Sequence, residues 1–495
     1  MSSNGSGIGP DGPIEARVCI GGEWIEAPST YEVVNPATEQ VVGLAPQASV
    51  QQNLDATRAA AEAFESWSAT PAAERAALLE AAADLYDRRR DEFVPLVQAE
   101  TGATMRVTKT MQVPQVSARF RRYARGALES PIIPLEPQVV PNTALAPGGI
   151  VSAVGHRAPV GVVSCITSYN FPVTNMAGKI GPALAMGNTV VVKPAPQDPL
   201  AVIKLVEVMH EAGFPPGVIN VTCGTDVAAS EALVSSPHVD MVSFTGSTAV
   251  GRRIGEVAGG EMKRLLLELG GKGACIVFDD ADLRAAIGGI SSVWAFHSGQ
   301  ICTAPTRVIA QRGIVDQLVA GLTRAAGALK VGDPLERDTV VGPVITEVHR
   351  GRIEGYVQSA RDEGAEIAVG GGRPDIERGF FVAPTLITGA TNQMTAVREE
   401  IFGPVVVVVP FDEPDEAIQI ANDSDFGLYS YVFSADTGRA WDLAKRLRSG
   451  NVGINSLQRN HEAPFGGFKQ SGVGRDGGSF GLHAYSELQS IVWPG

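Results

Sequence analysis

Three side chains stand out because their chemistry is complementary and their neighbours are unusual. Cys302 lies in the polar run Ser298–Pro305, between a glycine and a proline, where a thiol can face a ligand. Glu268 ends an otherwise apolar run, where partial burial raises the pKa of a carboxyl group towards neutrality, as a general base requires. Asn170 offers a side-chain amide, which together with a backbone N–H is a common way to hold an oxyanion. The sequence thus contains a candidate nucleophile, base and oxyanion donor.

Each of these residues also has an ordinary interpretation. A salt bridge between Glu268 and Lys272 would give the carboxylate a purely structural role, and an asparagine before Phe-Pro is more often a turn residue. The helix expected before Cys302 presents its C-terminal end, whose dipole has the wrong sign to acidify a thiol. Activation of Cys302 therefore has to come from other donors or from a base.

A second kind of chemistry is indicated by the run Phe244–Gly251, with the sequence FTGSTAVG, which follows a strand and opens a helix. Glycines there let the backbone approach a phosphate, and a helix N-terminus offers free N–H groups. The run is not a complete GxGxxG motif, so a plain tight turn is an equal alternative. Lys193, at a strand end, can place its ammonium on a ribose or phosphate group, although such a lysine is usually just solvated.

Strands and helices alternate around these residues, which predicts a parallel sheet covered on both faces. The carboxyl ends of such strands meet at one edge, where open α/β sheets bind ligands. The expected strands are Val160–Ile166, Thr189–Val192, Val218–Val221, Met241–Phe244 and Leu265–Leu267, and the expected helices are Val173–Ala185, Leu200–Glu211, Val227–Leu233 and Ala249–Val257. The loops predicted on the shared edge are Ser168–Asn170, Lys193–Gln197, Gly224–Thr225, Thr245–Ser247 and Glu268–Gly270.

A second β/α block follows, and other elements flank the two blocks. Its expected strands are Cys275–Phe278, Thr306–Ala310, Phe380–Leu386, Val405–Pro410 and Tyr429–Phe433, with helices at Leu283–His297, Val315–Leu329 and Asp415–Asn422. Short strands are expected over residues 18–45, and Ala-rich helices over 50–96. The Pro-rich segment 131–149 is either an interdomain linker or an extended arm that pairs with another subunit. Residues 486–492 form one further candidate strand.

Composition limits the classes of partner and compartment. The chain has 495 residues, a formal net charge of −14 and 44% apolar residues, and this acidic balance argues against nucleic acid or an anionic membrane as a partner. No apolar run approaches the length that spans a bilayer, and the start of the chain does not resemble a secretory signal. The widely spaced cysteines Cys19, Cys165, Cys223 and Cys275 are interpreted as packing residues. We therefore expect a soluble, cytoplasmic protein with no metal site.

In combination these motifs resemble the aldehyde dehydrogenase superfamily. The match extends from about Val18 to the end of the chain, in the family's order and spacing. It rests on Asn170 in YNFP, Lys193 in VVKPA, FTGSTAVG, Glu268 in LELGGK, Cys302 in GQICTAP, Glu399–Val405 with the sequence EEIFGPV, and Pro464–Gly472 with the sequence PFGGFKQSG.

The resemblance implies an α/β fold with two Rossmann-like, doubly wound domains and a small β arm for oligomerisation. Residues 1–16 would form a flexible tail, and 17–130 with 151–268 the NAD(P)-binding domain. Residues 269–460 would form the catalytic domain, and 131–150 with 480–495 the arm. A homodimer and a homotetramer are both compatible with such an arm.

The resemblance also implies a mechanism and a set of site residues. The Cys302 thiolate would attack an aldehyde, the Asn170 amide would hold the oxyanion, and Glu268 would activate the water that releases a carboxylate. The cofactor, NAD or NADP, would contact Thr167, Ser168, Lys193, Gly224, Gly246, Ser247, Glu400 and Phe402. The substrate tunnel would be lined by Tyr169, Phe171, Gly178, Ile301, Thr303 and Phe465.

Three departures from the family pattern bear on specificity. Pro196 stands where NAD-preferring members often carry a glutamate that binds the adenosine ribose, so both NAD and NADP remain open. Tyr169 replaces a frequent tryptophan and Gly178 a frequent bulky aromatic residue, which predicts a roomier tunnel for a large aliphatic or aromatic aldehyde. Cys302 has Ile301 and Thr303 as neighbours, so no adjacent thiol can protect it. The physiological aldehyde is not encoded in these motifs.

Two rival functions remain at this level. A CoA-acylating semialdehyde dehydrogenase has the same fold, but its branch typically lacks a glutamate at the position of Glu268. A non-catalytic relative that kept the fold would usually have lost the nucleophile or the base, and both are present here.

Overall fold

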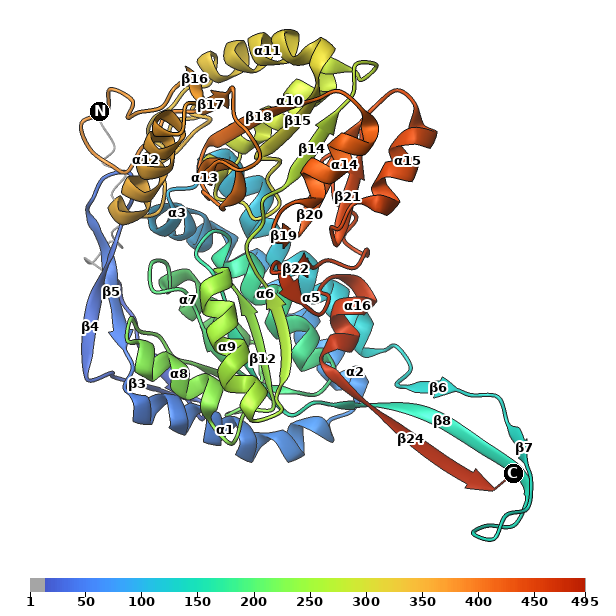
Figure 1. Ribbon diagram of the computed structural model, residues 1–495. Coiled ribbons are helices and arrows are strands. Elements are labelled where there is room, and N and C mark those ends of the chain that lie inside the picture. The colour runs from blue at the N-terminus through green and yellow to red at the C-terminus, as the bar shows by residue number, and fades with distance from the viewer. Residues whose placement is uncertain (1–13, 495) are drawn as a thin grey trace.

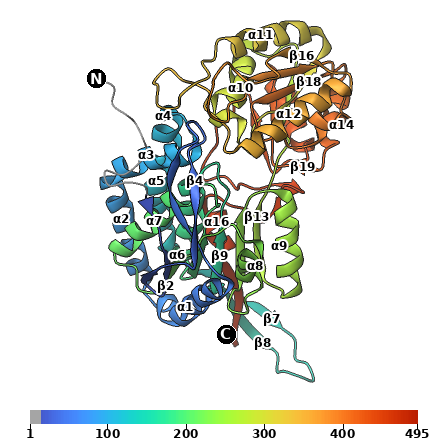
Figure 2. The same cartoon turned by 90° about the vertical axis from the view of Figure 1, so that its left-hand side faces the viewer.

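The computed structural model describes residues 14–494 and contains two open α/β sheets, each with its own helices, and a projecting β arm. The body of the molecule has two lobes stacked on one another, and the arm leaves the lobe that contains helices α1–α9 (Figures 1 and 2). Most of the predicted tail lies outside the described residues. Its end is not a tail, because strand β1 (Ile14–Glu15) pairs in parallel with strand β5 (Val41–Gln47). No helix within residues 14–494 is both long and apolar enough to cross a bilayer.

The first sheet carries the predicted parallel strands. Its order is β23-β13-β12-β9-β10-β11-β2-β3, with β9 central and the chain crossing from one side of β9 to the other. Five of its strands, all parallel, are β9 (Val162–Ile166), β10 (Thr189–Lys193), β11 (Ile219–Val221), β12 (Met241–Thr245) and β13 (Arg264–Glu268). The strands in antiparallel pairings are β2 (Val18–Ile20), which lies between β11 and β3, and the two edge strands β3 (Glu23–Ile25) and β23 (Gly472–Val473).

Helices cover both faces of this sheet, as apolar strands without alternation require. The predicted crossover helices are present as α6 (Pro172–Ala185), α7 (Leu200–Glu211), α8 (Val227–Ser235) and α9 (Thr248–Gly260). The N-terminal helices are α1 (Val50–Ser68), α2 (Ala72–Arg88), α3 (Arg90–Thr101), α4 (Met105–Val107), the π-helical turn η1 (Thr108–Gln112) and α5 (Val113–Ala127). Phe120 and Tyr123 of α5 are buried in the core of this lobe, so α5 is anchored against the neighbouring helices.

The second sheet has the order β16-β17-β18-β15-β14-β20-β21 and is parallel except for its β16 edge. Its strands are β14 (Ala274–Val277), β15 (Arg307–Gln311), β16 (Glu366–Val369), β17 (Thr385–Thr388), β18 (Val405–Phe411), β20 (Tyr429–Phe433) and β21 (Asn451–Ile454). Its helices are α10 (Leu283–Ala295), η2 (His297–Gly299), η3 (Arg312–Ile314), α11 (Val315–Gly327), α12 (Glu347–Asp362), α13 (Thr395–Arg398), α14 (Pro414–Asn422) and α15 (Thr437–Arg446).

One strand of this block was placed too early by sequence. The predicted strand 380–386 begins only at Thr385, because the backbone of Phe380 bonds to other loops: its N–H donates to Pro36 O, and its carbonyl accepts from Val344 N.

The arm is a four-stranded antiparallel sheet that extends away from the body (Figure 1). Strand β24 (Ser486–Pro494) pairs along its whole length with β8 (Gly149–Pro159), and β6 (Ile132–Pro134) and β7 (Gln138–Val140) pair with the other edge of β8. Thus β8 continues nine residues past the predicted arm boundary at 150, and the Pro-rich segment is part of a sheet rather than a free linker. The remaining elements are β4 (Ser29–Val34), β19 (Phe426–Gly427), β22 (Phe468–Lys469) and α16 (Gly478–Ala484).

Candidate active site

The candidate site lies where the carboxyl edge of the first sheet meets the amino edge of the second. Strand β13 ends at Glu268, and residues 269–273 lead directly into β14. Asn170 follows β9, whereas Cys302 precedes β15 and Glu400 precedes β18. The meeting of these edges therefore brings together loops that lie more than 200 residues apart in the sequence.

Asn170 connects the two edges directly. Its Nδ2 donates to Gln300 O at 2.9 Å, two residues before Cys302, and its Oδ1 accepts from Ser168 Oγ at 2.8 Å. Asn170 is buried, and these two bonds assign the orientation of its amide. The second hydrogen of Nδ2 has no protein acceptor among the described residues, so it can donate to an oxyanion beside Cys302.

Cys302 lies between η2 and β15 and is half-buried, while the other four cysteines are buried. The preceding turn is held in left-handed backbone conformation at His297 and Ser298, and Ser298 Oγ donates to Gly342 O at 2.7 Å. Burial raises the pKa of the Cys302 thiol to about 12, and the negative charges of Glu400 and Glu268 act in the same direction. The neutral thiol is therefore the stable form here, and ionisation needs a base or a nearby positive charge.

Glu268 is a buried carboxylate with neither oxygen hydrogen-bonded within residues 14–494. Burial raises its pKa well above the usual range, the charge of Asp476 adds to this, and Lys179 and Arg459 oppose it. The salt bridge with Lys272 that we weighed as an alternative is wrong, because Lys272 Nζ donates to Ala396 O at 2.7 Å. An unpartnered buried carboxyl group with a raised pKa is suited to accept a proton from water.

Several of the residues predicted to bind the cofactor lie on the first sheet's carboxyl edge. Thr167 is buried, and its Oγ1 has no partner among the described residues. Within residues 14–494, Lys193 Nζ makes only a long contact of 3.4 Å with Gly224 O, and burial lowers the pKa of this lysine. Ser247 caps helix α9 by accepting from Val250 N at 3.3 Å, and Gly246 N donates to Glu268 O at 3.0 Å. The unmet hydrogen bonds of Thr167 and Lys193 fit a polar ligand at this edge.

Glu400 and Phe402 lie on the side of the site that the second sheet forms, in the loop before β18. Glu400 Oε1 accepts from Gly271 N at 2.7 Å, and the carboxylate lies so close to Gly270 that a side chain there would collide with it. Burial raises the pKa of Glu400 to about 7. Phe402 has a φ of 58°, an unfavourable backbone conformation for a phenylalanine. Its carbonyl bonds to His349 Nε2 at 2.8 Å, which holds this strained turn in place.

The predicted tunnel residues do not all behave as expected. The Tyr169 ring packs edge-on against Phe402 with centroids 5.9 Å apart, and Phe171 stacks on Phe296 at 5.8 Å. Ile301 and Thr303 are half-buried beside Cys302. The expectation of extra space at Gly178 is wrong.

The space beside Gly178 is filled from a neighbouring helix. A side chain at this position of α6 would collide with the guanidinium of Arg119 from α5. Near it, the guanidinium carbon of Arg459 lies 3.7 Å from the centroid of the predicted tunnel residue Phe465.

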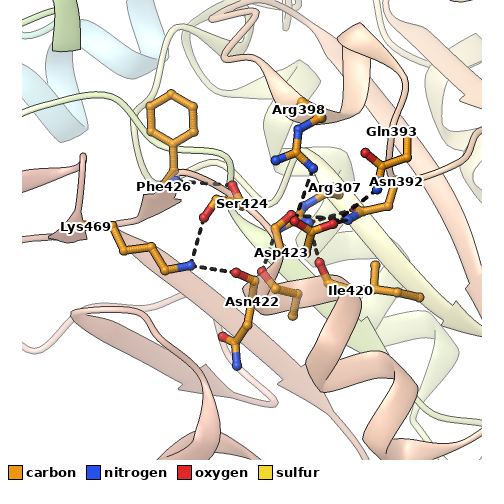
Figure 3. A network of polar contacts seen from close by, with 11 residues as sticks. Arg307, Asn392, Gln393, Arg398, Ile420, Asn422, Asp423, Ser424, Phe426 and Lys469 are labelled. Carbon is orange, nitrogen blue, oxygen red and sulfur yellow. Dashed lines mark hydrogen bonds and ion pairs between the residues drawn. The ribbon is translucent and has the colours of Figure 1, made fainter.

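A network of polar contacts fixes the elements that carry Cys302 and Glu400 relative to each other (Figure 3). Arg307 begins β15, five residues after Cys302, and is buried. It donates to Asn392 Oδ1 at 3.1 Å and to Ile420 O at 2.7 Å. Asp423 binds Asn392 at 2.8 Å and Arg398 at 3.3 Å, at the end of α13 just before Glu400. This network therefore couples the positions of the Cys302 loop and of the Glu400 loop.

Sequence reasoning missed several charged residues near the site. Lys179 is buried and donates to Ser243 Oγ at 3.0 Å, and its charge acts on Glu268. Arg119, Arg459 and Asp476 come from segments with no motif of their own. The only available signal was the position of Arg459 six residues before Phe465, inside a polar loop.

Comparisons with known proteins agree with this geometry. The model of the aldehyde dehydrogenase family matches residues 24–491. The chain is 39% identical to the geranial dehydrogenase of Castellaniella defragrans, covering 96% of this chain and 98% of that protein. It is 35% identical to the betaine aldehyde dehydrogenase of Bacillus subtilis, covering 95% and 96%.

Solved structures give the same result. An NAD+ complex of an aldehyde dehydrogenase from Bacillus cereus superimposes with a TM-score of 0.91 at 37% identity, covering 97% of both chains. The betaine aldehyde dehydrogenase of Staphylococcus aureus in complex with NAD+ gives 0.92 at 37% identity, covering 96% and 94%. These matches confirm the resemblance and the fold class drawn from the sequence motifs. The chain belongs to the aldehyde dehydrogenase family and is an NAD(P)-dependent oxidoreductase that acts on aldehydes.

Proposed function

We propose that this enzyme converts an aldehyde to the carboxylate through a covalent intermediate on Cys302 that is released by water. The observation that carries the proposal is the buried, unpartnered carboxylate of Glu268 at the edge that faces the Cys302 loop. A carboxyl group without a structural partner in such a place destabilises the fold, which is understandable if it serves as a base.

The chemistry of the chain's own residues follows from their contacts. The Cys302 sulfur, once deprotonated, forms a bond to the aldehyde carbon. The carbonyl oxygen then takes up the negative charge and accepts hydrogen bonds from Asn170 Nδ2 and the Cys302 N–H. Loss of a hydride from the same carbon leaves a thioester. Glu268 then takes a proton from water, whose oxygen attacks the thioester carbon and expels the sulfur as a thiolate.

The cofactor would be held by residues on both edges of the site. Thr167 and Lys193, with their unmet hydrogen bonds, would bind its adenosine end, Gly246 and Ser247 at the start of α9 its pyrophosphate, and Glu400 with Phe402 its nicotinamide ribose and ring. Ser168 and Gly224 complete this set. When bound, the nicotinamide accepts a hydride from the substrate carbon.

The choice between NAD+ and NADP+ depends on the loop after Lys193. The structures of two relatives were solved in complex with NAD+, which supports NAD+ as the cofactor of this enzyme. However, Pro196 provides no carboxylate to repel a 2′-phosphate. Steady-state kinetics on one aldehyde with each cofactor will decide the preference.

A product assay tests the reaction itself. Incubation of the enzyme with a panel of aldehydes and NAD+ or NADP+ should give free carboxylate at a rate that added coenzyme A does not change. Formation of an acyl-CoA in place of the carboxylate would establish the CoA-acylating alternative. Cofactor binding and iodoacetamide labelling of Cys302 without turnover on any aldehyde would establish a non-catalytic protein.

We also propose that the arm joins copies of this chain. Val139, Leu488 and Val492 expose more than half of their surface on this thin sheet, more apolar surface than an isolated arm would leave in water. A homodimer or a homotetramer would cover it, and light scattering after size exclusion distinguishes the two from a monomer. Five cysteines without disulfides agree with a reducing, cytoplasmic compartment.

A further inference from the structure

Two arginines without carboxylate partners contact predicted tunnel residues. The Arg119 guanidinium occupies the space beside Gly178, and the guanidinium carbon of Arg459 lies over the Phe465 ring, 3.7 Å from its centroid. Within residues 14–494 neither makes a hydrogen bond or an ion pair, although many of the other arginines do. Arg119 is half-buried, where a guanidinium group normally finds acceptors for its five N–H donors, whereas Arg459 is exposed.

The two positive charges act on one another and on the reacting groups. Surrounding protein atoms partly desolvate the Arg459 guanidinium and lower its pKa, and the charge of Arg119 lowers it further. The charge of Arg459 in turn lowers the pKa values of Cys302 and Glu268. Two like charges without an ion-pair partner repel each other, and an anion bound by both would relieve that repulsion.

The neighbouring acidic groups do not fill this role. Glu462 is paired with Arg122 at 2.5 Å. Asp476 acts on Arg459 electrostatically, but lies outside ion-pair distance, and its Oδ1 accepts from Gly477 N at 2.7 Å. His461, whose pKa is lowered by burial and by both arginines, adds no negative charge.

We propose that the aldehyde oxidised at Cys302 carries an anionic oxyacid group at its far end, which Arg119 and Arg459 bind together. This inference rests on the proposed function and adds the substrate class to it. Two guanidinium groups offer paired N–H donors that match a carboxylate or a phosphate. The same pair disfavours a cationic aldehyde, which would meet two like charges beside the nucleophile.

The test compares aldehydes that differ only in the terminal group. The probes are ω-oxocarboxylates of increasing chain length, n-alkanals of the same lengths, an aldehyde phosphate, and betaine aldehyde as the cation. We expect kcat/KM for the best ω-oxocarboxylate to exceed that of its matched alkanal by about 10- to 100-fold, the contribution of one or two charge-assisted hydrogen bonds. A preference for the aldehyde phosphate over every ω-oxocarboxylate would identify phosphate as the anion bound.

Variants of the two arginines test whether they cause the preference for an anionic aldehyde. In Arg119→Gln and in Arg459→Gln, kcat/KM for the ω-oxocarboxylate divided by kcat/KM for its matched alkanal should fall to near one. In Arg119→Lys this ratio should recover in part. Arg121→Gln is the matched control on the same helix, because Arg121 is paired with Asp84 at 2.7 Å and Asp87 at 2.8 Å, and it should keep the wild-type ratio. Because the ratio is measured within each variant, a general loss of activity does not change it.

A binding measurement is independent of turnover. An unreactive dicarboxylate should slow the alkylation of Cys302 by iodoacetamide in the wild type and in Arg121→Gln, but not in Arg119→Gln. Equal kcat/KM for alkanals and ω-oxo acids of every length, or a preference that survives in both glutamine variants, would overturn the proposal while leaving the oxidation of aldehydes intact. Failure of the proposed function would look different, since no aldehyde of any class would then give a free carboxylate.

Discussion

The two α/β sheets of this enzyme present opposite edges to one site. The first sheet uses the carboxyl ends of its strands, where Lys193 and Glu268 are the last residues of β10 and β13 and Asn170 lies in the loop after β9. The second uses the amino ends, so that Cys302 and Glu400 precede their strands. The usual rule that open α/β sheets bind ligands at strand carboxyl ends therefore describes only one half of this molecule.

The difference separates the two chemical tasks. In the proposed mechanism the first sheet supplies the base and an amide, and the second supplies the nucleophile, yet the Asn170–Gln300 bond joins the two sheets. The charge of Glu268 raises the pKa of Cys302, so the two halves are not electrostatically independent. The following predictions test whether the halves act together as described, from the largest expected effect to the smallest.

Removing the nucleophile from the second sheet should abolish its half of the chemistry. Cys302→Ala should lower kcat by about 10⁵-fold or more, as removal of a covalent nucleophile does in other enzymes. Cys275→Ala, in the buried strand β14, is the control and should remain active. Turnover by Cys302→Ala near the wild-type rate would refute the assignment of Cys302.

Removing the amide that bridges the sheets should have a smaller effect. Asn170→Ala should lower kcat by about 10²–10³-fold, which is typical for the loss of one oxyanion donor. Ser168→Ala leaves the amide but removes the bond that orients it, and should cost about tenfold. A wild-type kcat in Asn170→Ala would show that the oxyanion is held elsewhere.

The network behind the second sheet should matter for stability. Arg307→Met leaves three carbonyl and amide acceptors without their donor, at Asn392, Ile420 and Ala421. We expect the free energy of unfolding to fall by about 3 kcal/mol. The control Arg312→Met removes only an exposed pair with Asp412 and should cost less than about 1 kcal/mol. Equal losses in the two variants, measured by denaturant unfolding, would mean that the network adds no more to the free energy of unfolding than an exposed ion pair does.

The raised pKa of Glu268 predicts a small, pH-dependent gain in stability when this charge is removed. A carboxyl group whose pKa is raised by folding is neutral at low pH, where it does not oppose folding. As the pH rises through the folded-state pKa, the buried group ionises and this contribution to the free energy of unfolding is lost. Glu268→Gln should therefore raise Tm more at pH 8 than at pH 5, by a few degrees. An identical Tm difference at both values would show that Glu268 titrates normally.

The sequence predicted the fold well where apolar periodicity is strong. Helix α7 and strand β20 have the bounds that the residue pattern predicts, and most strands of both sheets are within two residues of expectation. Prediction failed for helix α12, which is polar and half-exposed, and for the strand at 385–388, whose preceding residues are apolar but bond to distant loops. Apolar composition alone does not reveal where backbone hydrogen bonds go.

The site was predictable in its motifs but not in its electrostatics. Cys302, Glu268 and Asn170 lie in distinctive runs, and the structure brings their loops together. The vacant space expected at Gly178 depended on a helix 60 residues earlier, and only the folded structure shows that Arg119 fills it. Sequence periodicity likewise gave no hint that the second sheet faces the site with its amino edge.

The division of labour between the two sheets is tested most directly by the pre-steady-state kinetics of Glu268→Gln. If Glu268 acts only on water, this variant should still give a burst of reduced cofactor close to that of the wild type. Its steady-state turnover should then fall by about 10²–10⁴-fold, the usual contribution of a general base. Loss of the burst in the same proportion as the turnover would contradict the account, because Glu268 would then be required to activate the Cys302 thiol.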